Sequence, residues 1–147
     1  MTYTVSMALG PKPQFPLEHL FRALADSTRL RILNLIAERE ICVCYFVEIL
    51  QMGQSKISRH LAYLRRGGIA AARREGKWMH YRLVAPKDPV AAAILRETLQ
   101  HLSAQPQMQR DLSRLARACC MPEKFEVLKR APQPGLPPAP RISGASR

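Results

Sequence analysis

The segment "QSKISRHLAYLRRGGIAAARREGKWMHYRL", residues 54–83, decides the fold, because its hydrophobic period changes halfway along. Apolar and polar side chains alternate over residues 78–83, and Gly76 offers a tight turn ahead of them, which predicts a two-stranded hairpin. The first half predicts an amphipathic helix that ends at Gly67, since three apolar residues recur there at i, i+4 and i+7. They are Ile57, Leu61 and Leu64.

Helical patterns flank this segment on both sides. Three helices are expected ahead of it, over residues 16–26, 26–39 and 45–50, with Asp26 as the N-cap of the second. Behind the hairpin, Asp88 and Pro89 are a good N-cap and first residue for a helix over 89–102, and Pro106 restarts a helix that runs to the last cysteines.

Three compact helices followed by a hairpin predict a winged helix-turn-helix, so the expected fold class is mainly α (α+β), with flanking dimerisation helices. The helices over 16–25 and 89–118 carry more apolar surface than so small a domain can bury, which predicts a homodimer. We expect a loose arm over residues 1–15, a DNA-binding and dimerisation domain over 16–120, and a proline-rich, disordered tail over 121–147.

Positive charge is concentrated in the same decisive segment. The chain has a formal net charge of +12, and between Ser55 and Arg82 eight Lys and Arg face a single acid, Glu75. Cations on the outer face of a helix and at a hairpin tip favour double-stranded operator DNA as the partner over a merely solvated surface. His60 lies near the apolar edge of its helix, so a structural role is its alternative. The expected DNA-contacting residues are Gln54, Ser55, Lys56, Ser58, Arg59, His60, Arg73, Arg74 and Lys77.

Four cysteines fall into two close pairs, Cys42 with Cys44 and Cys119 with Cys120. No signal-peptide pattern opens the chain, and no apolar run approaches membrane-spanning length, so we expect a cytoplasmic protein with no membrane partner and no further protein partner. Thiols stay reduced in that compartment, and four of them indicate metal ligands or reactive thiols before disulfides. Core packing is the alternative for Cys119, which continues an apolar stripe.

Four segments together resemble the ArsR family of metal-responsive bacterial repressors, in its arsenic-sensing branch. They are "FRALADSTRLRILNLI" (21–36), "EICVCYFVEIL" (40–50), "QSKISRHLAYLRRGGI" (54–69) and "RREGKWMHYRL" (73–83). The resemblance implies a dimeric winged-helix repressor that binds operator DNA when metal-free and releases it when a metal or metalloid binds. The inducer it implies is trivalent arsenic, as arsenite, with antimonite and methylarsenite close behind.

The resemblance also implies which thiols bind the inducer. In the arsenic branch the Cys-Val-Cys segment before the recognition helix supplies ligands, which here are Cys42 and Cys44, and a third cysteine often follows where this chain has Val47. Cys119 and Cys120 resemble ligands that other members carry on their last helix. Soft thiolates select soft acceptors, so all four are candidate ligands. A small-molecule thiol or a cysteine of the second subunit could supply the third ligand.

The spacing of Cys42 and Cys44 gives two further expectations. Residues two apart on a helix point about 200° apart, whereas in extended backbone they face the same side, so binding should hold or unwind the start of the helix. A helix N-terminus near basic side chains should also lower the pKa of these thiols.

Three other functions compete with this hypothesis. A repressor of the same fold could respond to cadmium, lead or zinc, although residues 1–41 lack the N-terminal cysteines of the cadmium and lead sensors. A thiol-redox repressor could release DNA when either pair oxidises. An enzyme is not expected, because the chain has no paired-carboxylate site, glycine-rich phosphate loop or nucleophile elbow.

Overall fold

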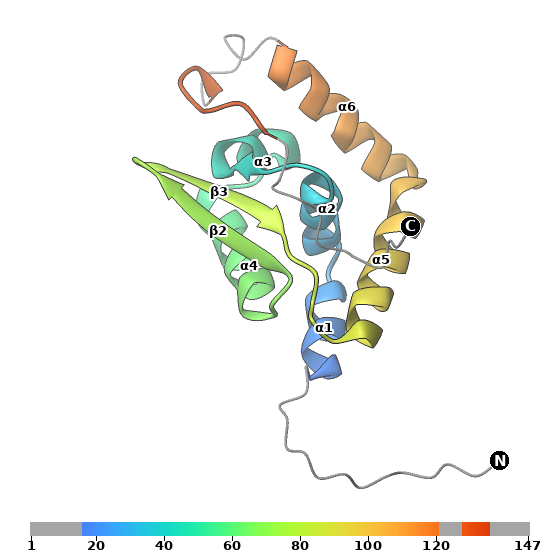
Figure 1. Ribbon diagram of the computed structural model, residues 1–147. Coiled ribbons are helices and arrows are strands. Elements are labelled where there is room, and N and C mark those ends of the chain that lie inside the picture. The colour runs from blue at the N-terminus through green and yellow to red at the C-terminus, as the bar shows by residue number, and fades with distance from the viewer. Residues whose placement is uncertain (1–15, 121–127, 136–147) are drawn as a thin grey trace, which may run out of the picture.

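The computed structural model describes residues 16–120 and 128–135, the side chain of Cys120 excepted. It confirms the winged helix-turn-helix, mainly α with an antiparallel hairpin (Figure 1). The expected arm over 1–15, and residues 121–127 and 136–147 of the expected tail, lie outside the described residues. The elements are α1 (Leu17–Leu24), α2 (Ser27–Ile36), β1 (Ile41–Cys42), α3 (Val43–Leu50), α4 (Gln54–Arg66), β2 (Ala70–Glu75), β3 (Trp78–Leu83), α5 (Pro89–Ser103) and α6 (Pro106–Cys120).

Local sequence signals set several of these boundaries. The Asp26 carboxylate caps α2 by accepting a hydrogen bond from the Arg29 backbone N–H at 3.0 Å, and Asp88 caps α5 through the N–H of Ala91 at 3.1 Å. Such caps satisfy backbone donors that have no partner inside the helix. Gly76 turns the hairpin with a φ of +62°, which a residue without a Cβ adopts at little cost.

The sheet has three antiparallel strands in the order β1-β3-β2. Cys42 on β1 pairs with His80 on β3, and His80 pairs with Arg73 on β2, so these three residues form one row across the sheet. In the view of Figure 1 the hairpin lies to the left of α2, while α5 and α6 lie to its right. Among the described residues, no helix is long and apolar enough to cross a membrane.

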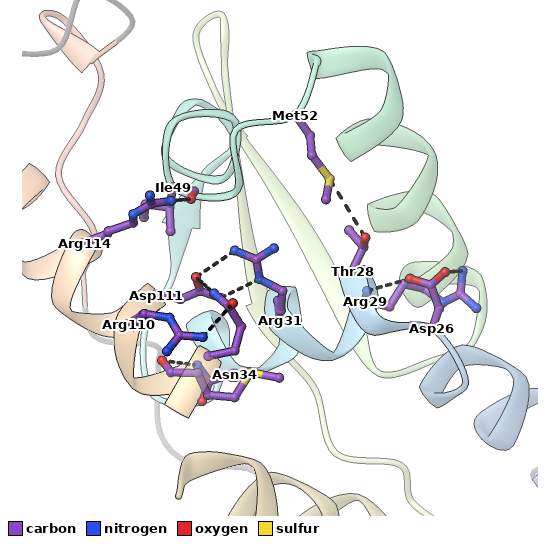
Figure 2. Close-up of polar contacts among 12 residues, drawn as sticks. Asp26, Thr28, Arg29, Arg31, Asn34, Ile49, Met52, Arg110, Asp111 and Arg114 are labelled. Atoms are coloured by element: carbon purple, nitrogen blue, oxygen red, sulfur yellow. Dashed lines mark hydrogen bonds and ion pairs between the residues drawn. The ribbon is translucent and has the colours of Figure 1, made fainter. Parts of the chain in front are cut away.

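Polar contacts dock α6 onto α2 and α3, and Figure 2 shows them. The Arg31 guanidinium donates to both carboxylate oxygens of the fully buried Asp111, at 2.7 and 2.8 Å. Asn34 Nδ2 donates to the Met108 carbonyl at 3.2 Å. Closer to the C-terminal end of α6, Arg114 Nη1 donates to the carbonyl of Ile49 on α3 at 2.9 Å. These contacts fix α6 against α2 and α3.

Residues 128–135 lie in the segment for which the sequence predicts disorder, and here the structure differs from that expectation. The Leu128 side chain is fully buried, Glu40 and Gly135 exchange backbone hydrogen bonds of 2.6 and 3.0 Å, and Gln133 Nε2 donates to the Cys119 carbonyl at 3.0 Å. One apolar anchor and one backbone bridge hold a proline-rich stretch that has no periodic pattern of its own. Amino-acid composition alone therefore does not predict this contact.

Candidate DNA-binding surface and thiol site

Helix α4 is fixed by its apolar stripe and presents its first turn to solvent. The three stripe residues named above, Ile57, Leu61 and Leu64, have no exposed surface. The residues expected to contact DNA at the start of the helix are all exposed: Gln54, Ser55, Lys56, Ser58 and Arg59. In helix-turn-helix proteins the N-terminal residues of the recognition helix reach base edges in the major groove. The geometry of α4 suits that role.

His60 differs from the other residues expected to contact DNA. Its Nδ1 lies 3.4 Å from an Arg29 guanidinium nitrogen and 3.8 Å from the Asp26 carboxylate, so the ring packs against the start of α2. Burial lowers the pKa of His60, and Arg29 lowers it further, while Asp26 acts in the opposite direction. A neutral, partly buried imidazole at this position supports the structural alternative.

The wing is the hairpin formed by β2 and β3, and the cations that it carries lie in two different surroundings. Arg73 Nη2 lies 2.6 Å from the Glu40 carboxylate, and its hydrogen bond holds the pKa of that carboxyl below the usual range. Arg74 and Lys77 are exposed near the turn, and the Lys77 ammonium lies 5.1 Å from the centre of the Trp78 ring. Arg74 and Lys77 at the tip of the hairpin are thus available to a DNA phosphate backbone. Arg73, by contrast, is bound to Glu40, the residue that precedes β1.

The first thiol pair lies where β1 ends and α3 begins. Cys42 is buried and is the N-cap of α3, with an extended backbone (φ −74°, ψ 146°), and Cys44 is half-buried in the first turn. The two thiols lie close enough for Cys42 to raise the pKa of Cys44. Cys42 thus has the extended backbone in which residues i and i+2 face one side, and the expectation that binding holds or unwinds the start of this helix stays a prediction. Because only Cys44 is helical, the strand-to-helix junction already points both thiols to one place.

The expectation of a lowered thiol pKa is also wrong for Cys44. Burial raises the pKa of the Cys44 thiol to about 11, and the neighbouring Cys42 adds to the rise. Its own backbone N–H and Lys77 lower the pKa by less. The helix N-terminus is too buried at this point for its dipole to outweigh desolvation. Cys44 is consequently a neutral thiol at physiological pH.

Tyr45, which follows Cys44 in the first turn of α3, is a residue that sequence reasoning missed. The Tyr45 side chain is fully buried, and within the described part of the chain its hydroxyl has no hydrogen-bond partner. Burial, then Cys119, Cys42 and Cys44, raise the pKa of Tyr45 to about 12. The only sequence signal was an aromatic residue with a polar tip directly after the Cys-Val-Cys segment.

The structure therefore assembles part of the expected thiol site. Cys42 and Cys44 lie together at the start of α3, and Cys119 is half-buried on α6. The side chain of Cys120 lies outside the described residues. Within residues 16–120 and 128–135, no group of three or more His, Cys, Asp or Glu side chains is placed to hold a metal ion.

Comparisons with known proteins agree with this fold and these surfaces. Residues 26–71 match the family model described as bacterial regulatory protein, arsR family. Over 103 residues the chain is 46% identical to the arsenical resistance operon repressor of Escherichia coli (strain K12), covering 69% of this chain and 86% of that protein. It is 54% identical over 65 residues to the arsenic resistance transcriptional regulator ArsR1 of Pseudomonas putida (strain KT2440), covering 44% and 51%. The solved structure of HlyU from Vibrio cholerae N16961 superposes with a TM-score of 0.52 at 32% identity, covering 60% and 92%.

The apolar stripe of α4 is buried, the first turn of α4 is exposed, and the hairpin of β2 and β3 is cationic. Together these features define a winged helix-turn-helix protein that binds DNA. The chain belongs to the ArsR family of bacterial regulatory proteins, and it is a transcriptional repressor of that family and not an enzyme.

Proposed function

We propose that this chain is a homodimeric repressor of an arsenic-resistance operon, which binds operator DNA in the inducer-free state and releases it when trivalent arsenic binds its thiols. The observation that carries the proposal is the placement of Cys42, in extended backbone, and Cys44 together at the junction of β1 and α3. The arsenical resistance repressors among its relatives support the choice of inducer.

The donor set fits a soft, thiol-seeking ligand. Two sulfur atoms in one partly buried place favour arsenic, antimony or cadmium over hard cations, which prefer oxygen. Each thiol exchanges for one hydroxyl of arsenous acid and releases one water, so arsenic stays trivalent and no oxidant is needed. Val47, half-buried on α3, offers no third sulfur. We place a second dithiol site at Cys119 and Cys120, at the end of α6.

The position of the first pair gives a physical route from inducer to DNA. Cys42 pairs with β3, the central strand of the wing, and Glu40 two residues earlier holds Arg73 of β2. Helix α3, which begins with Cys44 in its first turn, packs against the recognition helix α4. A ligand that joins the two sulfurs can bind one arrangement of β1, the wing and α4 better than another. In that case its binding shifts the equilibrium toward the arrangement that it binds better.

On the DNA side, α4 enters the major groove with its exposed first turn, Gln54 to Arg59, and the wing adds Arg73, Arg74 and Lys77 to the backbone contacts. His60 supports α4 from within. Exposed apolar side chains support a homodimer through the flanking helices, since Phe21 on α1 is 52% exposed and Val90 on α5 is 57% exposed.

Fluorescence anisotropy with the DNA upstream of its operon tests the proposal. The reduced, full-length protein is titrated onto the DNA, and arsenite, antimonite, cadmium and zinc are then added separately. Release by arsenite at about one equivalent per thiol pair is the expected result. Release by cadmium alone would make the protein a divalent-metal sensor. Release only on oxidation, reversed by reductant, would make it a redox sensor.

A further inference from the structure

The Tyr45 hydroxyl is a buried polar group without a hydrogen-bond partner in the described part of the chain. Its side chain has no exposed surface, so the hydroxyl does not face bulk solvent. A buried hydroxyl without a partner is costly, and such groups in native proteins call for an explanation. A ligand that brings its own acceptor is one such explanation.

The backbone places Tyr45 and Cys42 on one face of α3. Cys42 is the N-cap of α3 and Tyr45 is three residues later, so the two side chains lie on the same face of the first turn. The Arg114 hydrogen bond to the Ile49 carbonyl holds α6, the helix that carries Cys119, against α3. The effect of all three thiols on the pKa of Tyr45 agrees with this arrangement.

Two thiols leave one position on trivalent arsenic unfilled by protein sulfur. Arsenous acid that exchanges two hydroxyls for Cys42 and Cys44 releases two waters and keeps one hydroxyl. Methylarsenous acid, which has two hydroxyls and one methyl group, also releases two waters, but it keeps only the methyl group. Arsenic is trivalent before and after both reactions. The two bound forms therefore differ in a single group, an oxygen acceptor in one and a methyl group in the other.

We propose that Tyr45 is a specificity-determining residue of this site: its buried hydroxyl donates a hydrogen bond to the oxygen that arsenite retains, and so favours arsenite over methylarsenite. The inference rests on the proposed function, since it needs arsenic at Cys42 and Cys44. It predicts that the hydroxyl matters to one ligand and not to the other, which a purely structural role of Tyr45 would not produce.

Tyr45→Phe, which removes only the hydroxyl, tests this in the full-length protein. Operator release is titrated with arsenite and with methylarsenite for wild type, Tyr45→Phe and the control Tyr81→Phe, which makes the same change at a buried position on β3. For Tyr45→Phe we expect the arsenite midpoint to rise about tenfold, as for loss of one hydrogen bond between a ligand and a buried donor, with the methylarsenite midpoint unchanged. Tyr81→Phe should change neither midpoint.

Thermal unfolding of the inducer-free protein guards against a folding defect, and Tyr45→Phe should melt no lower than wild type, because it deletes a hydroxyl without a partner. An equal rise for both arsenicals, or no rise for either, would overturn the role of Tyr45 while leaving the proposed function intact. Wild-type protein that is released by neither arsenical would overturn the proposed function and this inference with it.

Discussion

Asp111 is a fully buried carboxylate between α6 and α2, and its replacement by alanine should lower the free energy of unfolding by about 3 kcal/mol. Arg31 donates two hydrogen bonds to it, at 2.7 and 2.8 Å, and Gln107 Nε2 donates a third at 2.9 Å. Removing one partner of a buried ion pair costs roughly 3–5 kcal/mol. We take the lower end because the Arg31 side chain keeps 19% of its exposure and can regain water.

Thermal unfolding followed by circular dichroism measures this cost, at one protein concentration because a dimer unfolds with a concentration-dependent midpoint. For a domain of this size about 3 kcal/mol corresponds to a drop in Tm of roughly 10–20 °C. Glu97→Ala, at an exposed acid on α5, is the matched control and should stay within about 0.5 kcal/mol of wild type. The pair Arg31→Met with Asp111→Leu should recover much of the loss, since it leaves no unpaired buried charge.

A loss below about 1 kcal/mol for Asp111→Ala would refute this reasoning, because it would mean that Arg31 and Gln107 find equivalent partners elsewhere. It would also remove the main polar contact that docks α6 on α2. The position of Cys119 relative to the first thiol pair depends on that docking, so this result would weaken the account of how α6 meets α3.

Three further predictions concern the site itself. With its pKa raised to about 11, the Cys44 thiol should react slowly with iodoacetamide at pH 8 in the native protein, and faster as pH rises toward 11; equal rates in native and urea-unfolded protein, read by peptide mass spectrometry, would contradict the burial of this thiol. Lys56→Ala should lower the slope of log K for operator binding against log salt by about one unit, whereas Lys87→Ala, an exposed lysine away from α4, should leave the slope unchanged. Glu40→Gln removes the charge that holds Arg73, so it should tighten operator binding at low salt and raise the arsenite concentration needed for release. If anisotropy titrations of this variant equal those of wild type in both respects, the Glu40–Arg73 ion pair does not couple the wing to β1.

Local chemistry made most of the fold predictable. Asp26 and Asp88 are N-caps because their short carboxylates reach backbone donors within three residues, and the stripe headed by Ile57 needed only a period of 3.6. Gly76 turned the hairpin for a reason visible in one residue. Each of these signals involves residues that are only a few positions apart, so it can be recognised from the sequence alone.

Contacts between distant segments were not predictable in the same way. Arg31 and Asp111 are 80 positions apart, and nothing near either residue marks the other as its partner. Strand β1 is two residues long, too short for an alternating pattern, so neither this strand nor its pairing with β3 was predicted. The burial that raises the pKa of Cys44, and the partnerless hydroxyl of Tyr45, arise from the same packing of α3 against the rest of the domain.

Operator release by variants that lack one thiol pair tests the central claim most directly. The full-length Cys42→Ser, Cys44→Ser double variant and the Cys119→Ser, Cys120→Ser double variant are each bound to labelled operator DNA under reducing conditions and titrated with arsenite. We predict that the first variant binds DNA as tightly as wild type and is not released, while the second is still released. Release that survives the loss of Cys42 and Cys44 but disappears with Cys119 and Cys120 would contradict the assignment of the switch to the junction of β1 and α3.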